Sequence, residues 1–135
     1  MLKLGLDPEI KDSLLINCLL EEIEKGNKLP FPKIDFYSLR GTVISDYIAT
    51  IELPSPVFSI DKTKKILVAA PVTNSEVLVS GKVGYFELLN RDKRIIYRGL
   101  VSNKKLEDSP CIVVNNVNWD KGDILNMKSI NLIIS

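Results

Sequence analysis

Ser80-Gly81-Lys82-Val83-Gly84-Tyr85-Phe86-Glu87-Leu88-Leu89 and Ile95-Ile96-Tyr97-Arg98-Gly99-Leu100-Val101 alternate apolar with polar residues, and the polar Asn90-Arg91-Asp92-Lys93 separates them. Such alternation is typical of β-strands that bury one face. Four polar residues between two such runs fit a hairpin loop that is built around a type I turn. The glycines within both runs indicate bulges or close backbone approach. This stretch therefore predicts an antiparallel hairpin at the centre of a β-rich fold.

Further alternating runs lie on both sides of the hairpin. They predict strands over residues 33–39, 47–53, 64–70, 110–114 and 124–134, with a polar connection over 115–122. In the first strand Ile34 and Phe36 share a face. In the second strand the residues expected to face inward are Tyr47, Ala49, Ile51 and Leu53. About seven or eight short strands favour an antiparallel β-sandwich.

The last of these runs changes phase. Leu125 and Met127 lie on one face, but Ile130, Leu132 and Ile134 continue one residue out of step. A slip of one residue would turn the apolar set to solvent, so we expect a β-bulge near residues 128–129.

One amphipathic helix is expected before the strands, within residues 7–26. Asp7 suits the N-cap and Pro8 the first helical position, while Gly26 ends the helix. Its apolar stripe consists of Ile10, Leu14, Leu15, Cys18, Leu19 and Ile23. The stripe either covers the open end of the β core or forms an oligomer contact. With a proline-containing linker over 27–32 and the sandwich over 33–135, the chain is expected to form a single domain over 1–135.

Composition limits the possible functions. The 135 residues include no histidine, which excludes histidine-based catalytic triads and histidine zinc sites. The chain also lacks a Gly-x-Ser-x-Gly elbow and a glycine-rich phosphate loop. We therefore expect a protein that is not an enzyme and needs no metal or cofactor. The net charge of +1 offers no electrostatic attraction to duplex nucleic acid or an acidic membrane.

The start of the chain and the cysteines bear on where the protein is made. The apolar run over 66–72 is far shorter than the ~20 residues of a membrane helix. The N-terminal residues reach Asp7 and Glu9 with no basic and apolar signal-like segment, so synthesis in the cytoplasm without export is expected. Cys18 and Cys111 are then expected to be buried, reduced thiols rather than a disulfide.

Two groups of side chains are candidates for binding. Arg94 and Arg98 belong to the basic cluster Arg91, Lys93, Arg94, Arg98, Lys104 and Lys105, which could follow a single-stranded nucleic acid. Asp92, Glu107 and Asp108 dilute this cluster, so nucleic acid is not the expected partner. Trp119, together with Tyr37, Tyr47 and Tyr85, could stack on a sugar, or Trp119 could plug one end of the sandwich.

The order of motifs also resembles a known group of proteins. Its segments are Ile34-Asp35-Phe36-Tyr37, Ala49-Thr50-Ile51-Glu52-Leu53-Pro54-Ser55-Pro56-Val57-Phe58, Gly81-Lys82-Val83-Gly84-Tyr85-Phe86-Glu87-Leu88, the Arg91-Asp92 turn and the alternating strand that begins at Ile124. In this order, after a short N-terminal helix, residues 7–135 resemble small bacteriophage virion proteins that are encoded among head and tail genes.

The resemblance implies a structural component of a phage particle, associated with the head, collar or tail. Its partners would be other copies of itself and other virion proteins, and it would reside in the virion. The family supplies no active-site residues. The candidate contact residues are Leu15, Leu19, Ile23, Arg94, Arg98 and Trp119. The alternative function is a glycan- or receptor-binding module of a fibre, in which Trp119 would contact the ligand.

Overall fold

The computed structural model describes residues 17–53, 58–61, 66–69, 72–104, 111–127 and 130–133. The fold is mainly β with one short helix, which covers residues 17–24 of the described chain. The part of the predicted helix before residue 17, including Asp7 and Leu15, lies outside the described residues. No helix in the described part of the chain has the length and apolarity needed to cross a membrane.

The described residues form eleven strands, more than the seven or eight that were expected. They are β1 (Lys33–Arg40), β2 (Val43–Glu52), β3 (Phe58–Asp61), β4 (Ile66–Ala69), β5 (Val72–Glu76), β6 (Gly81–Leu89), β7 (Ile95–Ser102), β8 (Cys111–Val113), β9 (Asn118–Trp119), β10 (Ile124–Met127) and β11 (Ile130–Ile133). The sequence patterns missed β3, β5 and β9.

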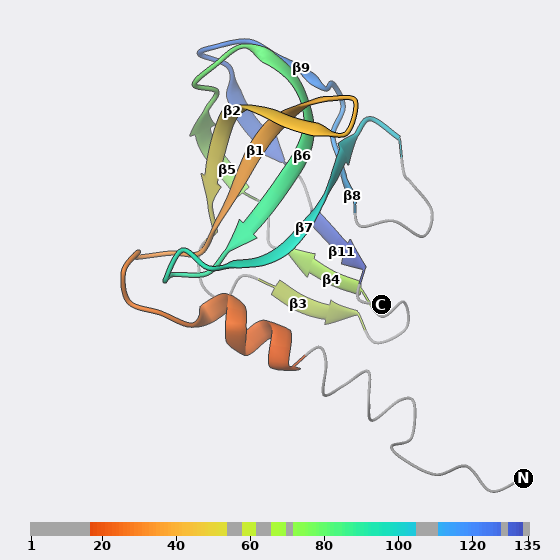
Figure 1. Cartoon of the computed structure of the whole chain (residues 1–135). Helices are drawn as coiled ribbons and strands as arrows, with labels where there is room; N and C mark the ends of the chain where they lie inside the picture. The colour runs from red at the N-terminus through yellow and green to blue at the C-terminus, as the bar shows by residue number, and fades with distance from the viewer. Residues whose placement is uncertain are drawn as a thin grey trace, which may run out of the picture.

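The strands belong to three sheets. Strands β2-β1-β6-β7-β8 follow one another in a six-stranded sheet in which β9 also pairs with β6. Strands β10 and β5 form a pair, and β11-β4-β3 form a third sheet. Figure 1 shows β1, β2, β6 and β7 curving across the front of the molecule, with β5 behind them and β3, β4 and β11 below. The expectation of purely antiparallel pairing is wrong at one edge, because β7 and β8 are parallel and the large sheet is therefore mixed.

The hairpin predicted from the sequence is confirmed. Strands β6 and β7 pair antiparallel, and the N–H of Lys93 donates to the carbonyl of Asn90 to close the turn. The Asn90 side chain is buried, and its Oδ1 accepts from the backbone N–H groups of Asp92 and Arg94, both at 3.0 Å. Lys93 has a φ of 65°, which is unusual for a residue other than glycine.

The inward face predicted for β2 is wrong at Tyr47. Ala49 pairs with Phe36 and Tyr47 pairs with Tyr37, so Ile48 is an extra residue in β2 and forms a β-bulge. Both Ile48 and Ala49 are completely buried, while Tyr47 is 36% exposed. Because the bulge shifts the alternation by one residue, Tyr47 points to the outer face of the sheet, opposite to the side that strict alternation predicts.

The single closing strand expected over 124–134 is also corrected. β10 pairs with β5, whereas β11 pairs with β4 in a different sheet. The change of phase in the apolar pattern therefore coincides with a transfer of the chain from one sheet to another. The bulge expected near residues 128–129 lies outside the described residues. The fold is mainly β, but the β-sandwich arrangement stays a prediction. The strands divide among three separate sheets rather than two sheets packed face to face.

One core cluster joins the helix, the strands of the six-stranded sheet and β10. Its buried members are Ile23, Ile34, Phe36, Ile48, Ala49, Ile51, Leu53, Val77, Val83, Phe86, Leu88, Val101, Ile112, Trp119 and Leu125. The inner positions of β1 are the predicted Ile34 and Phe36, both fully buried. Ile23 brings the helix into the same core, and Leu19 packs against it from a half-buried position. The helix therefore covers the core, which was the first of the two interpretations of its apolar stripe.

Four hydrogen bonds join the chain after the helix to the tip of the β6–β7 hairpin. Arg91 N–H donates to Lys25 O (3.1 Å), Leu29 N–H donates to Arg91 O (2.8 Å), Arg91 Nε donates to Leu29 O (3.0 Å), and Asn27 N–H donates to Asp92 Oδ1 (3.0 Å). We call this set of contacts the latch. It fixes the helix to a hairpin more than sixty residues further along the chain.

Candidate functional site

A row of aromatic side chains crosses the outer face of the six-stranded sheet. Tyr37 of β1 lies opposite Tyr47 of β2 on one side and opposite Tyr85 of β6 on the other. The ring centroids are 5.6 Å apart for Tyr37 and Tyr47, and 5.9 Å apart for Tyr37 and Tyr85. Leu100 of β7 lies opposite Tyr85 and is 40% exposed. The side chains Tyr47, Tyr37, Tyr85 and Leu100 form what we call the tyrosine row.

A parallel row of polar side chains lies next to it, two residues along β1, β6 and β7 and, because of the bulge at Ile48, three residues along β2. Asp35 lies opposite Thr50 and Glu87, and Glu87 lies opposite Arg98. Asp35 is only 5% exposed, yet both its oxygens have partners: Thr50 Oγ1 donates to Oδ1 (2.7 Å), and Lys33 Nζ is 3.6 Å from Oδ2. Arg98 Nε is 3.8 Å from Glu87 Oε2. Each carboxylate thus has a cation beside it, which offsets the repulsion between the facing Asp35 and Glu87.

The two rows are linked by hydrogen bonds and by electrostatics. The hydroxyl of Tyr85 donates to Glu87 Oε2 at 3.1 Å. Burial, followed by the charges of Asp35 and Glu87, raises the pKa of Tyr37 to about 12. Burial also raises the pKa values of Tyr47 and Tyr85. All three phenols therefore stay neutral hydrogen-bonding groups across the physiological pH range.

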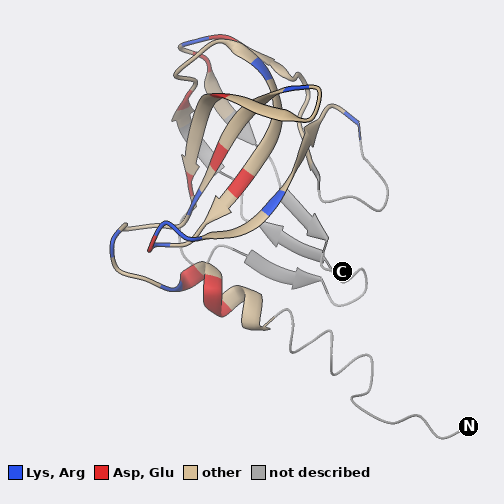
Figure 2. Cartoon of the chain, viewed as in Figure 1, with Lys and Arg blue, Asp and Glu red and all other residues tan. Residues whose placement is uncertain are grey.

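Together the tyrosine row and the polar row form the tyrosine face, which combines aromatic surface with hydrogen-bonding groups that are already ordered. Figure 2 shows acidic segments of β1 and β6 beside one another on this face, next to a basic segment of β7. Tyrosine is enriched at protein interfaces because one end of its side chain is apolar and the other is polar. A surface that combines aromatic rings with ordered polar groups is typical of protein interfaces.

The structure separates Trp119 from the three tyrosines. Trp119 lies in β9 and is 7% exposed, with its ring edge-on to Phe36 at 5.1 Å between centroids. Its Nε1 donates to the carbonyl of Asn116 at 2.7 Å. Trp119 therefore plugs the core, and its assignment as a ligand contact is wrong because the ring lies on the inner side of the sheet.

The other candidate residues are dispersed. Leu15 lies outside the described residues, Leu19 is half-buried, and Ile23 is completely buried, so Ile23 is not free to contact a partner. Arg98 belongs to the tyrosine face, whereas Arg94 is exposed at the hairpin tip. Cys18 forms no disulfide and is exposed, so the expectation that it is buried is wrong. It sits on the solvent side of the helix because Leu19 and Ile23 take the inner side.

The fold separates part of the basic cluster from the hairpin tip and adds two lysines of another segment to the part that remains there. The latch brings Lys25 and Lys28 to the hairpin tip, where Arg91, Lys93 and Arg94 lie. Figure 2 shows these basic segments gathered at one corner, beside the acidic residues of the helix. Lys104 follows the opposite end of β7, and Lys105 lies outside the described residues. The corner is not a continuous basic surface, because acidic residues border it.

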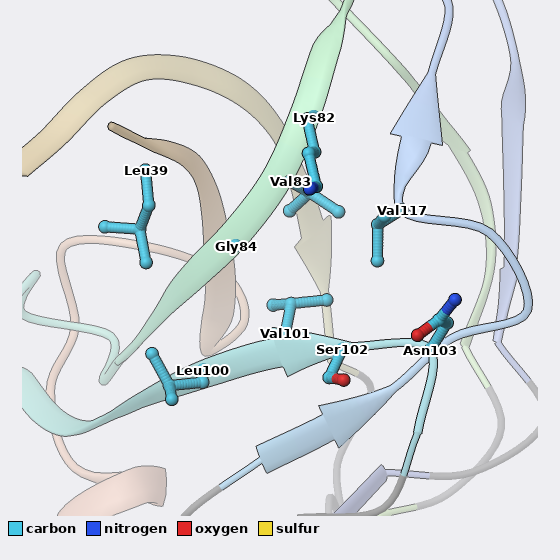
Figure 3. Close-up of a pocket in the computed structure, with 9 residues that line it drawn as sticks. All are labelled: Leu39, Lys82, Val83, Gly84, Leu100, Val101, Ser102, Asn103 and Val117. Carbon is cyan, nitrogen blue, oxygen red and sulfur yellow. The ribbon is translucent and has the colours of Figure 1, made fainter. Parts of the chain in front are cut away.

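A hollow of about 430 Å³ lies where β6 and β7 separate. Their pairing ends at Tyr85 and Leu100; beyond that point β6 pairs with β9, and β7 pairs with β8. The residues lining the hollow are Leu39, Lys82, Val83, Gly84, Leu100, Val101, Ser102, Asn103 and Val117. In Figure 3 the side chains of Val83, Val101 and Val117 converge on the space between the two strands. We call this space the fork hollow; Leu100 belongs both to its wall and to the tyrosine row.

The sequence patterns indicate the three tyrosines and Arg98 as candidates, but not Asp35, Thr50 or Glu87. A signal was present, because Asp35-Phe36-Tyr37 and Tyr85-Phe86-Glu87 are mirror-image patterns whose alternate residues share a face when the strands run antiparallel. The fork hollow had no comparable signal, since it depends on which strand each half of β6 pairs with.

Neither a metal-ligand cluster among the described residues nor a match to a known protein assigns a function to the tyrosine face. Within the described ranges, no three acidic or cysteine side chains come together as metal ligands. No protein-family model, no curated protein and no solved structure matches this chain.

Proposed function

We propose that this protein is a non-enzymatic structural component of a bacteriophage particle, located at the head, collar or tail and bound to other copies of itself or to other virion proteins. The observation that carries the proposal is the tyrosine face: a half-buried row of packed tyrosines, exposed at Tyr47 and Leu100, on a sheet whose opposite face is filled by the core. The order of sequence motifs, which resembles that of phage virion proteins, supports the setting. In this proposal the three sheets pack as a β-sandwich that acts as a rigid building block.

The charge pattern of the face favours a protein partner over a polyanion. Lys33 and Arg98 lie beside Asp35 and Glu87, so the polar row is electrically balanced. A balanced, hydrogen-bonded surface with aromatic side chains is typical of protein interfaces. A surface for nucleic acid would instead carry an excess of cations.

The test is mass spectrometry on density-purified particles of the phage that encodes this chain, with copy number scaled to the major capsid protein. We expect recovery in a fixed ratio. A Tyr47→Asp variant should lower incorporation at least tenfold, because a charge would be buried within the contact. Ile124→Asp, at an exposed position on β10, is the matched control and should incorporate normally. Absence of the wild-type chain from clean particles would refute the proposal.

Glycan binding is the second candidate, and the same face favours it. Tyrosine rings can stack on a sugar, while Thr50, Glu87 and Arg98 offer hydrogen bonds to hydroxyl groups. The ring planes, however, are inclined by 64° and 51° to one another, which gives no flat stacking platform. Titration of labelled protein with oligosaccharides, followed by NMR, tests this candidate. Shifts confined to the tyrosine face would support it. Trp119 fluorescence is not a suitable probe, because that ring is buried.

A further inference from the structure

We propose that the fork hollow binds the C-terminal end of a partner polypeptide, with the last, aliphatic side chain in the hollow and the free α-carboxylate beside Lys82. This inference rests on the proposed role in protein binding and specifies which part of the partner is recognised. The chemistry of the lining, the volume of the hollow and its position beside the tyrosine row lead to it.

In the described part of the chain, the lining combines aliphatic side chains with a single charged group, which is a cation. Its walls are aliphatic, formed by Leu39, Val83, Leu100, Val101 and Val117. The polar members are Lys82, Ser102 and Asn103, so among the described residues that line the hollow there is one cation and no carboxylate. An apolar side chain that enters the hollow is therefore stabilised by burial of its surface. An anionic group can form a charge-assisted hydrogen bond with Lys82. An ammonium, a hydroxyl and an amide can all donate hydrogen bonds to a carboxylate.

The shape of the hollow follows from the backbone. Gly84 has no side chain, and a Cβ there would lie 3.2 Å from the Cβ of Leu39, so Leu39 closes over that position. The backbone N–H of Val83 is bonded to Val117 O at 2.8 Å, which closes the side of the hollow toward β9. The resulting volume of about 430 Å³ lies within the ~300–1,000 Å³ of ligand pockets. It accommodates a branched side chain together with its terminal backbone.

The position of the hollow favours a polypeptide end over a free small molecule. Leu100 forms part of both the hollow and the tyrosine row, so the two surfaces are continuous. A partner that contacts the tyrosine row can therefore also place the end of its chain in the hollow, because the two surfaces adjoin. A free alkyl carboxylate would use the hollow alone and would gain nothing from the adjoining aromatic row.

The test uses the purified full chain, isotope-labelled for NMR, and a short peptide that ends in leucine with a free carboxylate. The same peptide with a C-terminal amide has the same shape without the charge. We expect the acid to shift the amide signals of Val83, Val101 and Val117, and to bind about tenfold more tightly than the amide. Lys82→Met should abolish this preference, because it retains the length of the side chain and removes the charge. Lys121→Met, at an exposed position outside the lining, is the matched control and should retain the preference.

Four outcomes would overturn the proposal. These are equal binding of the acid and the amide, an acid preference that survives in Lys82→Met, shifts confined to residues outside the hollow, and binding of free decanoate without any binding of the peptide acid. The proposed function fails by a separate result, the absence of the chain from purified particles, so the two failures are distinguishable.

Discussion

Replacing Gly26 by alanine tests the latch, because Gly26 lies where the chain after the helix touches the hairpin tip. Its φ is +116°, in the region that L-residues rarely adopt. A Cβ built on Gly26 would lie 2.5 Å from the backbone nitrogen of Asp92 and 2.6 Å from its Cγ. An Asp92→Ala substitution would not relieve the contact, since the nearest atom belongs to the backbone.

The magnitude can be worked out from these contacts. Forcing a residue with a Cβ into a positive φ costs roughly 1–2 kcal/mol. To admit the Cβ, the chain must also move away from Asp92, which strains the hydrogen bonds of the latch. Losing two of them at about 0.5–1.5 kcal/mol each brings the total to about 2–5 kcal/mol. Gly41 provides the control, because its φ is +64° and no atom lies within 4 Å of the added Cβ. Gly41→Ala should therefore cost only about 1 kcal/mol.

The assay is equilibrium unfolding in urea, followed by the fluorescence of Trp119, the sole and buried tryptophan. We expect Gly26→Ala to lower the free energy of unfolding by at least about 1 kcal/mol more than Gly41→Ala, with an unchanged dependence on urea. If the two variants agree within about 0.5 kcal/mol, the close approach between Gly26 and Asp92 does not stabilise the fold, and the reasoning is refuted.

Two further predictions concern backbone strain and pH. Lys93 has a φ of 65°, so Lys93→Gly should raise the free energy of unfolding by about 0.5–1 kcal/mol, whereas Lys93→Ala should not. Urea midpoints that are equal for the two variants would contradict this. The pKa of Tyr37 rises from 10.0 to about 12 in the folded chain, first through burial and then through the charges of Asp35 and Glu87. Because the folded pKa is the higher one, the stability that neutral Tyr37 contributes is complete below pH 10 and is lost as the pH rises toward 12. Unfolding measured over this range should show a shallower decline for Tyr37→Phe; an identical decline in both proteins would contradict the assignment.

The sequence predicts those parts of the fold that depend on local patterns. The β6–β7 hairpin follows from the polar Asn90-Arg91-Asp92-Lys93 between two alternating runs, and the turn forms as predicted. The inner positions of β1 follow from the same alternation. Local patterns fail where a bulge moves the following side chains to the other face of a strand, as Ile48 does in β2. No residue type in the sequence of β2 marks the position of this bulge.

Contacts between segments that are distant in the sequence could not be predicted from local sequence patterns. Asn27 and Asp92 are 65 residues apart, and nothing near either residue indicates that they meet. The polar neighbours of Trp119 predict a loop, yet the pairing of Trp119 with Gly81 brings its ring into the core. The tyrosine face was partly predictable, since its residues alternate along each strand, but the order of the strands decides which residues become neighbours.

The transfer of the chain between sheets at residues 124–133 also affects how the protein is made. Strand β5 pairs only with β10 among the described strands, and β11 covers one edge of β4. Both partner strands are synthesised after β9, so β4 and β5 emerge from the ribosome with unpaired edges. A nascent chain can complete the β6–β7 hairpin early, but it must keep these edges from other chains until residue 133 has been added. Slow translation or premature termination before this point would favour aggregation, even though all strands of the six-stranded sheet have been synthesised by then.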